Sequence, residues 1–88
     1  MVSSSFDIDE FFSKIKDRSY QEIIVLADRE ATAGERLECK TLENTERSRI
    51  VHYVGCLKDF ILYLRHGVRT RAIRDLDLAP FNKIRMDH

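Results

Sequence analysis

The sequence predicts an all-α protein, a small helical bundle built on an antiparallel helical hairpin with short flanking helices. Apolar residues in the central segment recur at alternating three- and four-residue steps, which is the period of a helix and not of a strand. The chain of 88 residues contains one proline and three glycines, too few breakers for an all-β protein with many turns. Two capping patterns in the first quarter of the chain mark helix starts.

The first helix is expected over residues 8–16. Asp7 is a suitable N-cap, Glu10 follows three residues later as in a capping box, and Phe6 is placed to pack against Phe11 as a hydrophobic staple. Acidic residues in the first turn and lysines in the last turn complement the helix dipole. The apolar face of this helix consists of Ile8, Phe11, Phe12 and Ile15.

A second helix begins at the capping box formed by Ser19 and Glu22. Its end is ambiguous, because the small residues of 31–34 can be either a close-packing stripe or a C-terminal stop with Gly34 left-handed. In one layout the helix continues to about Leu42 and the chain turns within 43–49, which gives a long hairpin.

In the other layout the turn lies near Gly34 and residues 35–66 form one long helix. We favour the hairpin, because residues 43–49 contain no apolar side chain and a helix of that length must bury a face throughout.

The central helix is expected from about Glu46 to Gly67, the glycine serving as its left-handed end. A short fourth helix over 69–75 follows, then an extended Ala79 before Pro80, with Phe81 and Ile84 tethering the tail. Residues 1–6 and 85–88 are expected to fray, and the whole chain, 1–88, to form a single domain. The main stripe of the central helix is Ile50, Tyr53, Leu57, Phe60 and Leu64.

Several apolar residues lie off this main stripe. A chain of this size buries roughly 60–65% of the surface that its unfolded form exposes, and three short neighbours can hardly cover both sides of the central helix. Homodimers solve this problem by sharing a core, and the small residues Ala27, Ala31 and Gly34 would permit close approach. The predicted dimer or partner interface is Val51, Gly55, Leu62 and Tyr63.

Charge is distributed unevenly along the chain. Fifteen basic and fifteen acidic residues cancel overall, but residues 1–44 carry six Lys/Arg against ten Asp/Glu and residues 45–88 carry nine against five. The two halves can therefore attract one another within a chain or between chains. A cluster near the end of the central helix has the guanidinium groups that suit phosphate binding; it comprises Arg65, Arg69, Arg71 and Arg74.

No motif points to catalysis, a cofactor or a metal. His52 and Cys56 stand four apart on one helix, the spacing of a metal pair, but two ligands do not make a site. Cys39, His66 and His88 show no zinc-module spacing. The sequence has no phosphate loop and no nucleophile elbow, and a thin core leaves little room for a substrate pocket.

Two cysteines in predicted helices and no secretory signal at the N-terminus lead us to expect a reduced, cytoplasmic protein. The longest uncharged run of the central helix, residues 50–57, is too short to span a membrane. The sequence therefore favours a non-catalytic, homodimeric interaction or regulatory module with a protein partner. The alternative is a nucleic-acid or phosphate-binding protein that uses the arginine cluster.

Overall fold

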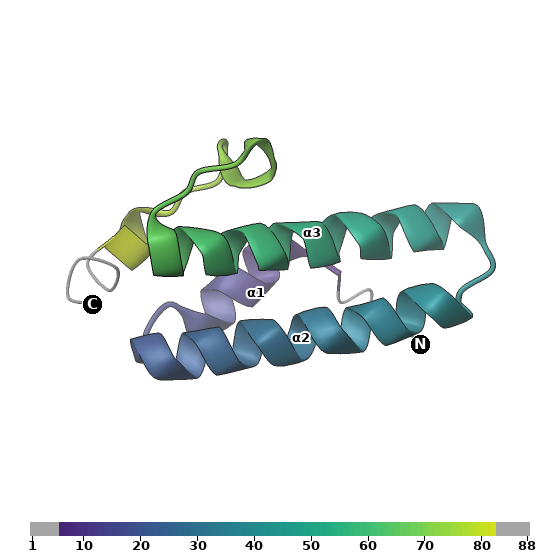
Figure 1. The fold of residues 1–88 in the computed structure, drawn as a ribbon, viewed down its shortest axis with the longest axis horizontal. Helices are drawn as coiled ribbons and strands as arrows, with labels where there is room; N and C mark the ends of the chain where they lie inside the picture. The colour runs from purple at the N-terminus through teal and green to yellow at the C-terminus, as the bar shows by residue number, and fades with distance from the viewer. Residues whose placement is uncertain (1–5, 83–88) are drawn as a thin grey trace.

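The computed structural model describes residues 6–82. Its elements are α1 (Ile8–Ile15), α2 (Tyr20–Lys40), α3 (Asn44–His66) and a 3-10 helix, η1 (Arg71–Ile73). No strand occurs in this part of the chain, so the predicted all-α class is confirmed. Figure 1 shows α2 and α3 side by side and antiparallel, with α1 packed behind them and the segment after α3 folded over the side of α3 that faces away from α2.

Both predicted helix starts are present. Asp7 caps α1 by accepting a hydrogen bond from the backbone N–H of Asp9 at 3.0 Å, and the Phe6 ring lies edge-on to the Tyr53 ring of α3, with centroids 5.7 Å apart. The box that opens α2 is complete in both directions, with Ser19 and Glu22 each bonding the other's backbone N–H. The backbone N–H and the hydroxyl of Ser19 both donate to Glu22 Oε1, and these two bonds lower the pKa of the exposed Glu22 carboxyl.

The predicted hairpin is also present, and the single-rod layout is wrong. α2 runs without a break through residues 31–34, because the small side chains there allow α3 to approach closely. A Cβ added at Gly34 would lie 2.5 Å from Cγ2 of Val54. Ala27, Ala31 and Gly34 are buried within the chain, so this small-residue row packs α2 on α3 of the same chain and is not left for a dimer.

The turn lies earlier than predicted, at residues 41–43, and most of the expected polar turn is the first part of α3. Glu43 caps α3 by accepting from the N–H of Glu46 at 2.7 Å, and Arg47 donates Nε and Nη2 to the Thr41 carbonyl at 3.1 and 2.6 Å. Thr41 in turn closes α2 through Oγ1, which donates to the Leu37 carbonyl at 2.7 Å. The caps start α3 here, and these first turns need no apolar face because they lie at the tip of the hairpin.

The core is centred on α3, and every residue of its predicted main stripe is buried. Phe12 of α1, Phe60 of α3 and Phe81 of the C-terminal segment meet at one end, with ring centroids 4.6 to 5.4 Å apart. Such offset and edge-on pairs stabilise a fold beyond the area that they bury. Three segments far apart in the sequence are therefore joined by one aromatic cluster.

The C-terminal segment, residues 68–82, is here called the arm. Gly67 ends α3 in the left-handed conformation, with φ 74°, as predicted, and sends the arm back over α3. Thr70 donates to Asp59 Oδ2 at 2.7 Å, and Ile73 is fully buried. Ala79 is helical and not extended, because Asp77 accepts its N–H at 3.1 Å and a proline in a first helical turn needs no donor. The predicted tether Ile84 lies outside the described residues.

Tyr53 links α3 to α2 by a hydrogen bond that should make the fold sensitive to alkaline pH. Its hydroxyl donates to Glu30 Oε1 at 2.9 Å, and burial, followed by this bond to a carboxylate, raises the pKa of Tyr53 above its ordinary value of 10.0. Above pH 10 the unfolded chain loses this proton while the folded chain keeps it, so stability falls as pH rises.

We expect the free energy of unfolding of the wild type to decline above about pH 10 by up to about 1.4 kcal/mol per pH unit from this group. Tyr53→Phe should remove this part of the decline. Urea denaturation of both proteins between pH 8 and about 11.5 measures the difference, and parallel profiles for the two proteins would contradict the assignment.

Candidate interaction face

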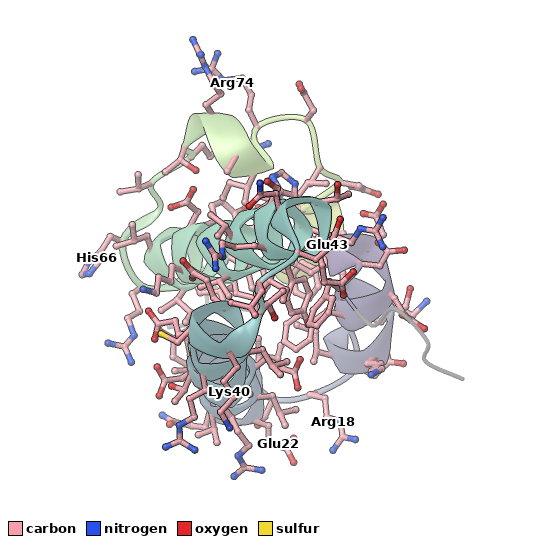
Figure 2. All side chains as sticks on the ribbon, turned by 90° about the vertical axis from the view of Figure 1, so that its right-hand side faces the viewer. Arg18, Glu22, Lys40, Glu43, His66 and Arg74 are labelled. Carbon is pink, nitrogen blue, oxygen red and sulfur yellow. The ribbon has the colours of Figure 1, made fainter. Side chains whose placement is uncertain are left out.

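One side of the α2–α3 pair is not covered by any other described element. Figure 2 looks along the pair and shows α1 on one side and the arm above α3. On the opposite side, where His66 projects, only the start of the arm runs beside α3, and no ribbon lies beside α2. We call this side the open face. It is made of one stripe from each helix, with residues spaced alternately three and four apart: Gln21, Val25, Asp28, Thr32, Glu35 and Cys39 on α2, and Val51, Gly55, Lys58, Leu62 and Arg65 on α3.

The open face exposes large apolar side chains. Val25 is 50% exposed, Val51 45% and Leu62 41%, so three of the six exposed large hydrophobic residues among residues 6–82 lie on one side. Nothing lies within 4 Å of a Cβ built at Gly55, so another helix has room to approach the backbone of α3 closely at this point. The predicted interface residues Val51, Gly55 and Leu62 thus share one uncovered surface.

The charged residues of the open face are sorted by helix. Its acids, Asp28 and Glu35, come from α2, and its bases, Lys58 and Arg65, come from α3. Lys58 pairs with Glu35 across the hairpin, and the hydrogen bond and charge of Glu35 raise the pKa of the Lys58 ammonium. Arg65 and Asp28 line one open groove together with Arg29 and Arg36 of α2, and Arg65 and Asp28 form no ion pair within the described residues.

Tyr63, the fourth predicted interface residue, does not lie on the open face. It is only 3% exposed, and its hydroxyl donates to Asn82 of the arm. Cys56, also off the main stripe, is 1% exposed beneath the arm and lies 3.9 Å from the Ala72 carbonyl. The arm therefore covers one of the two sides that were expected to need a second chain, and the assignment of Tyr63 to a free surface is wrong.

The four arginines of the predicted phosphate site fall on two surfaces. Arg65 lies against α2, beside Ile24. Arg69 belongs to the arm, where it donates to the Arg74 carbonyl at 3.0 Å and stacks 5.7 Å from the centroid of a tyrosine ring. In Figure 2 Arg74 projects from the arm, away from α2. The arm thus presents Arg69, Arg71 and Arg74 without Arg65.

The described part of the chain contains no cluster of side chains that suits nucleophilic catalysis or metal binding. Cys56 Sγ lies 3.6 Å from Nε2 of His52, but burial raises the pKa of this thiol, which opposes formation of a nucleophilic thiolate. Residues 6–82 contain no group of three or more potential metal ligands, and His88 lies outside them. No helix in this range is both long and apolar enough to cross a bilayer.

Sequence reasoning missed the α2 half of the open face. Val25 lies within the apolar run 23–27 near the start of α2, yet its exposure and that of Asp28 and Glu35 place these three residues on a common outer stripe. The signal was present as the alternating spacing of residues 21, 25, 28, 32, 35 and 39. It was hidden because only one member of this stripe is a large apolar residue.

Comparison of the chain with protein-family models, with curated proteins and with solved structures finds no match. The open face and the basic arm are therefore the two features from which a function can be proposed. They differ in chemistry: the open face combines apolar side chains with both signs of charge, whereas the part of the arm around η1 is dominated by arginine.

Proposed function

We propose that the protein is a non-catalytic helical interaction module that acts as a homodimer through the open face and contacts a protein partner. The observation that supports the proposal is the grouping of Val25, Val51 and Leu62, each 41 to 50% exposed, on the uncovered side of the hairpin. Apolar side chains exposed on one uncovered side, with charged residues between them, suit a surface that is covered by another protein. A hairpin from each chain can then complete a four-helix bundle.

Leu62→Glu tests the dimer, because it puts a charged side chain where the proposed interface buries an apolar one. Burying such a charge costs several kcal/mol, so a cost of about 3 kcal/mol would weaken the dimer roughly a hundredfold. We expect light scattering at micromolar concentration to give a dimeric mass for the wild type and a monomeric mass for the variant. Val51→Glu should act in the same way.

The matched control is Leu42→Glu, since Leu42 lies in the turn, is 87% exposed and is not part of the open face. This variant should remain dimeric, and circular dichroism should show the wild type and all three variants equally helical. A monomeric mass for the wild type at micromolar concentration would refute the proposal.

Phosphate or nucleic-acid binding is the second candidate. It is favoured by one observation: none of Arg65, Arg69, Arg71 and Arg74 forms an ion pair with an acid among residues 6–82, so the arginines are not neutralised by the acidic half of the chain. Duplex DNA added to the same samples distinguishes the candidates. Binding that disappears by physiological salt supports the interaction module, and submicromolar binding that persists there supports the second candidate.

A further inference from the structure

The two stripes that define the open face carry charges of opposite sign, with Arg29 and Arg36 of α2 beside the α2 stripe. α2 contributes the acids Asp28 and Glu35, and α3 contributes the bases Lys58 and Arg65. Asp28 and Arg65 form no ion pair in the described structure, and the Lys58–Glu35 pair is about half exposed on both sides. A second copy of the chain therefore offers each stripe a partner of the opposite sign.

A twofold dimer can bury this face in two ways. An axis that runs parallel to the helices lays α2 of one protomer antiparallel on α3 of its partner. An axis that crosses the helices lays α2 on α2 and α3 on α3. The first arrangement sets acids against bases, whereas the second sets like charges together, which is unfavourable at an interface.

We propose, building on the homodimer proposed above, that each protomer binds its copy with α2 against the partner's α3. The interface is isologous, because the same two stripes meet twice. Its driving force is the burial of the apolar members of the open face, and its orientation is set by the charges. The predicted attraction between the acidic and basic halves of the sequence acts here between chains.

The register of the hairpin brings apolar residues together in this arrangement. Gly34 lies opposite Val54, and an axis parallel to the helices leaves every residue at its own height. Val25, nine residues before Gly34, then meets Leu62 of the partner, which is eight residues after Val54. An offset of one residue along a helix is about 1.5 Å, so these two side chains come into contact.

The charges fall into register by the same reasoning. Asp28, six residues before Gly34, comes to a height between Lys58 and Leu62 of the partner. The Lys58 ammonium then lies between Glu35 of its own chain and Asp28 of the other. Because the network alternates in sign along the interface, added salt should weaken the wild-type dimer.

Charge reversal of one stripe at a time tests the arrangement. The first variant is Asp28→Lys with Glu35→Lys, and the second is Lys58→Glu with Arg65→Glu. In a dimer of either variant with itself, α2 and the partner's α3 carry charges of the same sign at both of their contacts. We therefore expect each variant to self-associate at least about tenfold more weakly than the wild type. Mixed in equal amounts they should form a heterodimer. Lys40→Glu, at the hairpin turn and away from the open face, is the control and should dimerise like the wild type.

Cross-linking tests which helices meet. Cys39 is exposed on α2 and Cys56 is buried, so the wild type carries one accessible thiol. The wild type is mixed with the double variant Cys39→Ser, Val51→Cys, whose accessible thiol lies on α3 and not on α2. In the proposed dimer these two positions lie two residues apart in height, about 3 Å. A short bismaleimide should therefore join unlike chains in a mixture and leave either chain alone largely uncoupled.

The outcomes separate the two proposals. A wild-type chain that is monomeric would refute the homodimer itself. A dimer whose two charge variants associate as strongly as the wild type, as stacking of like helices predicts, would refute only the arrangement of α2 on α3. A dimer that gives no cross-link between unlike chains would also refute that arrangement alone. Circular dichroism of each variant verifies that lost association is not lost folding.

Discussion

Replacing Leu57 by Ala is expected to lower the free energy of unfolding by about 2–5 kcal/mol. Leu57 is 0% exposed at the middle of α3, and the residues around it belong to one continuous core. Truncation removes apolar atoms and leaves a cavity that the neighbouring helices can only partly fill. Domains are stable by only about 5–15 kcal/mol, so the variant should be near the limit of folding at 25 °C.

Urea denaturation at one fixed protein concentration measures this loss, because the concentration matters for a chain that self-associates. Leu42→Ala is the matched control, as Leu42 is 87% exposed at the turn, and it should change stability by no more than about 0.5 kcal/mol. Equal midpoints for Leu57→Ala and the wild type would show that α3 does not pack as described.

The two helical glycines should respond to alanine with opposite signs. At Gly34 the new Cβ would lie 2.5 Å from Cγ2 of Val54, a β-branched side chain with little freedom to rotate. Overpacking of this kind costs about 1–3 kcal/mol, which exceeds the gain of up to about 1 kcal/mol that alanine brings to a helix. At Gly55 no atom lies within 4 Å of the new Cβ, so only that gain remains.

Gly34→Ala should therefore destabilise the protein while Gly55→Ala stabilises the folded monomer, as measured by urea midpoints at low protein concentration. Combining Gly34→Ala with Val54→Ala removes the methyl group that the new Cβ would overlap. The double variant should therefore lose less free energy of unfolding than the sum of the losses in the two single variants. Additive effects would show that α2 and α3 are not in close contact at this point.

Local sequence signals predicted where most helices begin and end. Asp7, the Ser19–Glu22 box and Gly67 all act as expected, because a cap is an interaction between residues at most a few positions apart. The buried stripe of α3 could be predicted for a similar reason: the period of a helix decides which residues share a side.

The turn of the hairpin was harder to place, because its signals are individually weak. Glu43 caps α3 although serine, threonine, aspartate and asparagine are the usual caps. The two hydrogen bonds from the Arg47 guanidinium to the Thr41 carbonyl form only once the turn is made. A polar stretch without an apolar side chain suggested a loop, yet at the tip of a hairpin it is compatible with an exposed helical start.

The sequence by itself determined the all-α class, the caps of α1 and α2, the left-handed end of α3 and the residues that share a side of α3, since these depend on short-range hydrogen bonds and helical period. Only the tertiary structure decided which sides are covered. The arm buries Tyr63 and Cys56, while Val51 and Leu62 remain exposed beside Val25 of α2. Periodicity cannot make this distinction, because covering a side depends on contacts between segments far apart in the chain, and here those contacts place the arm against one flank of α3 and leave the other open.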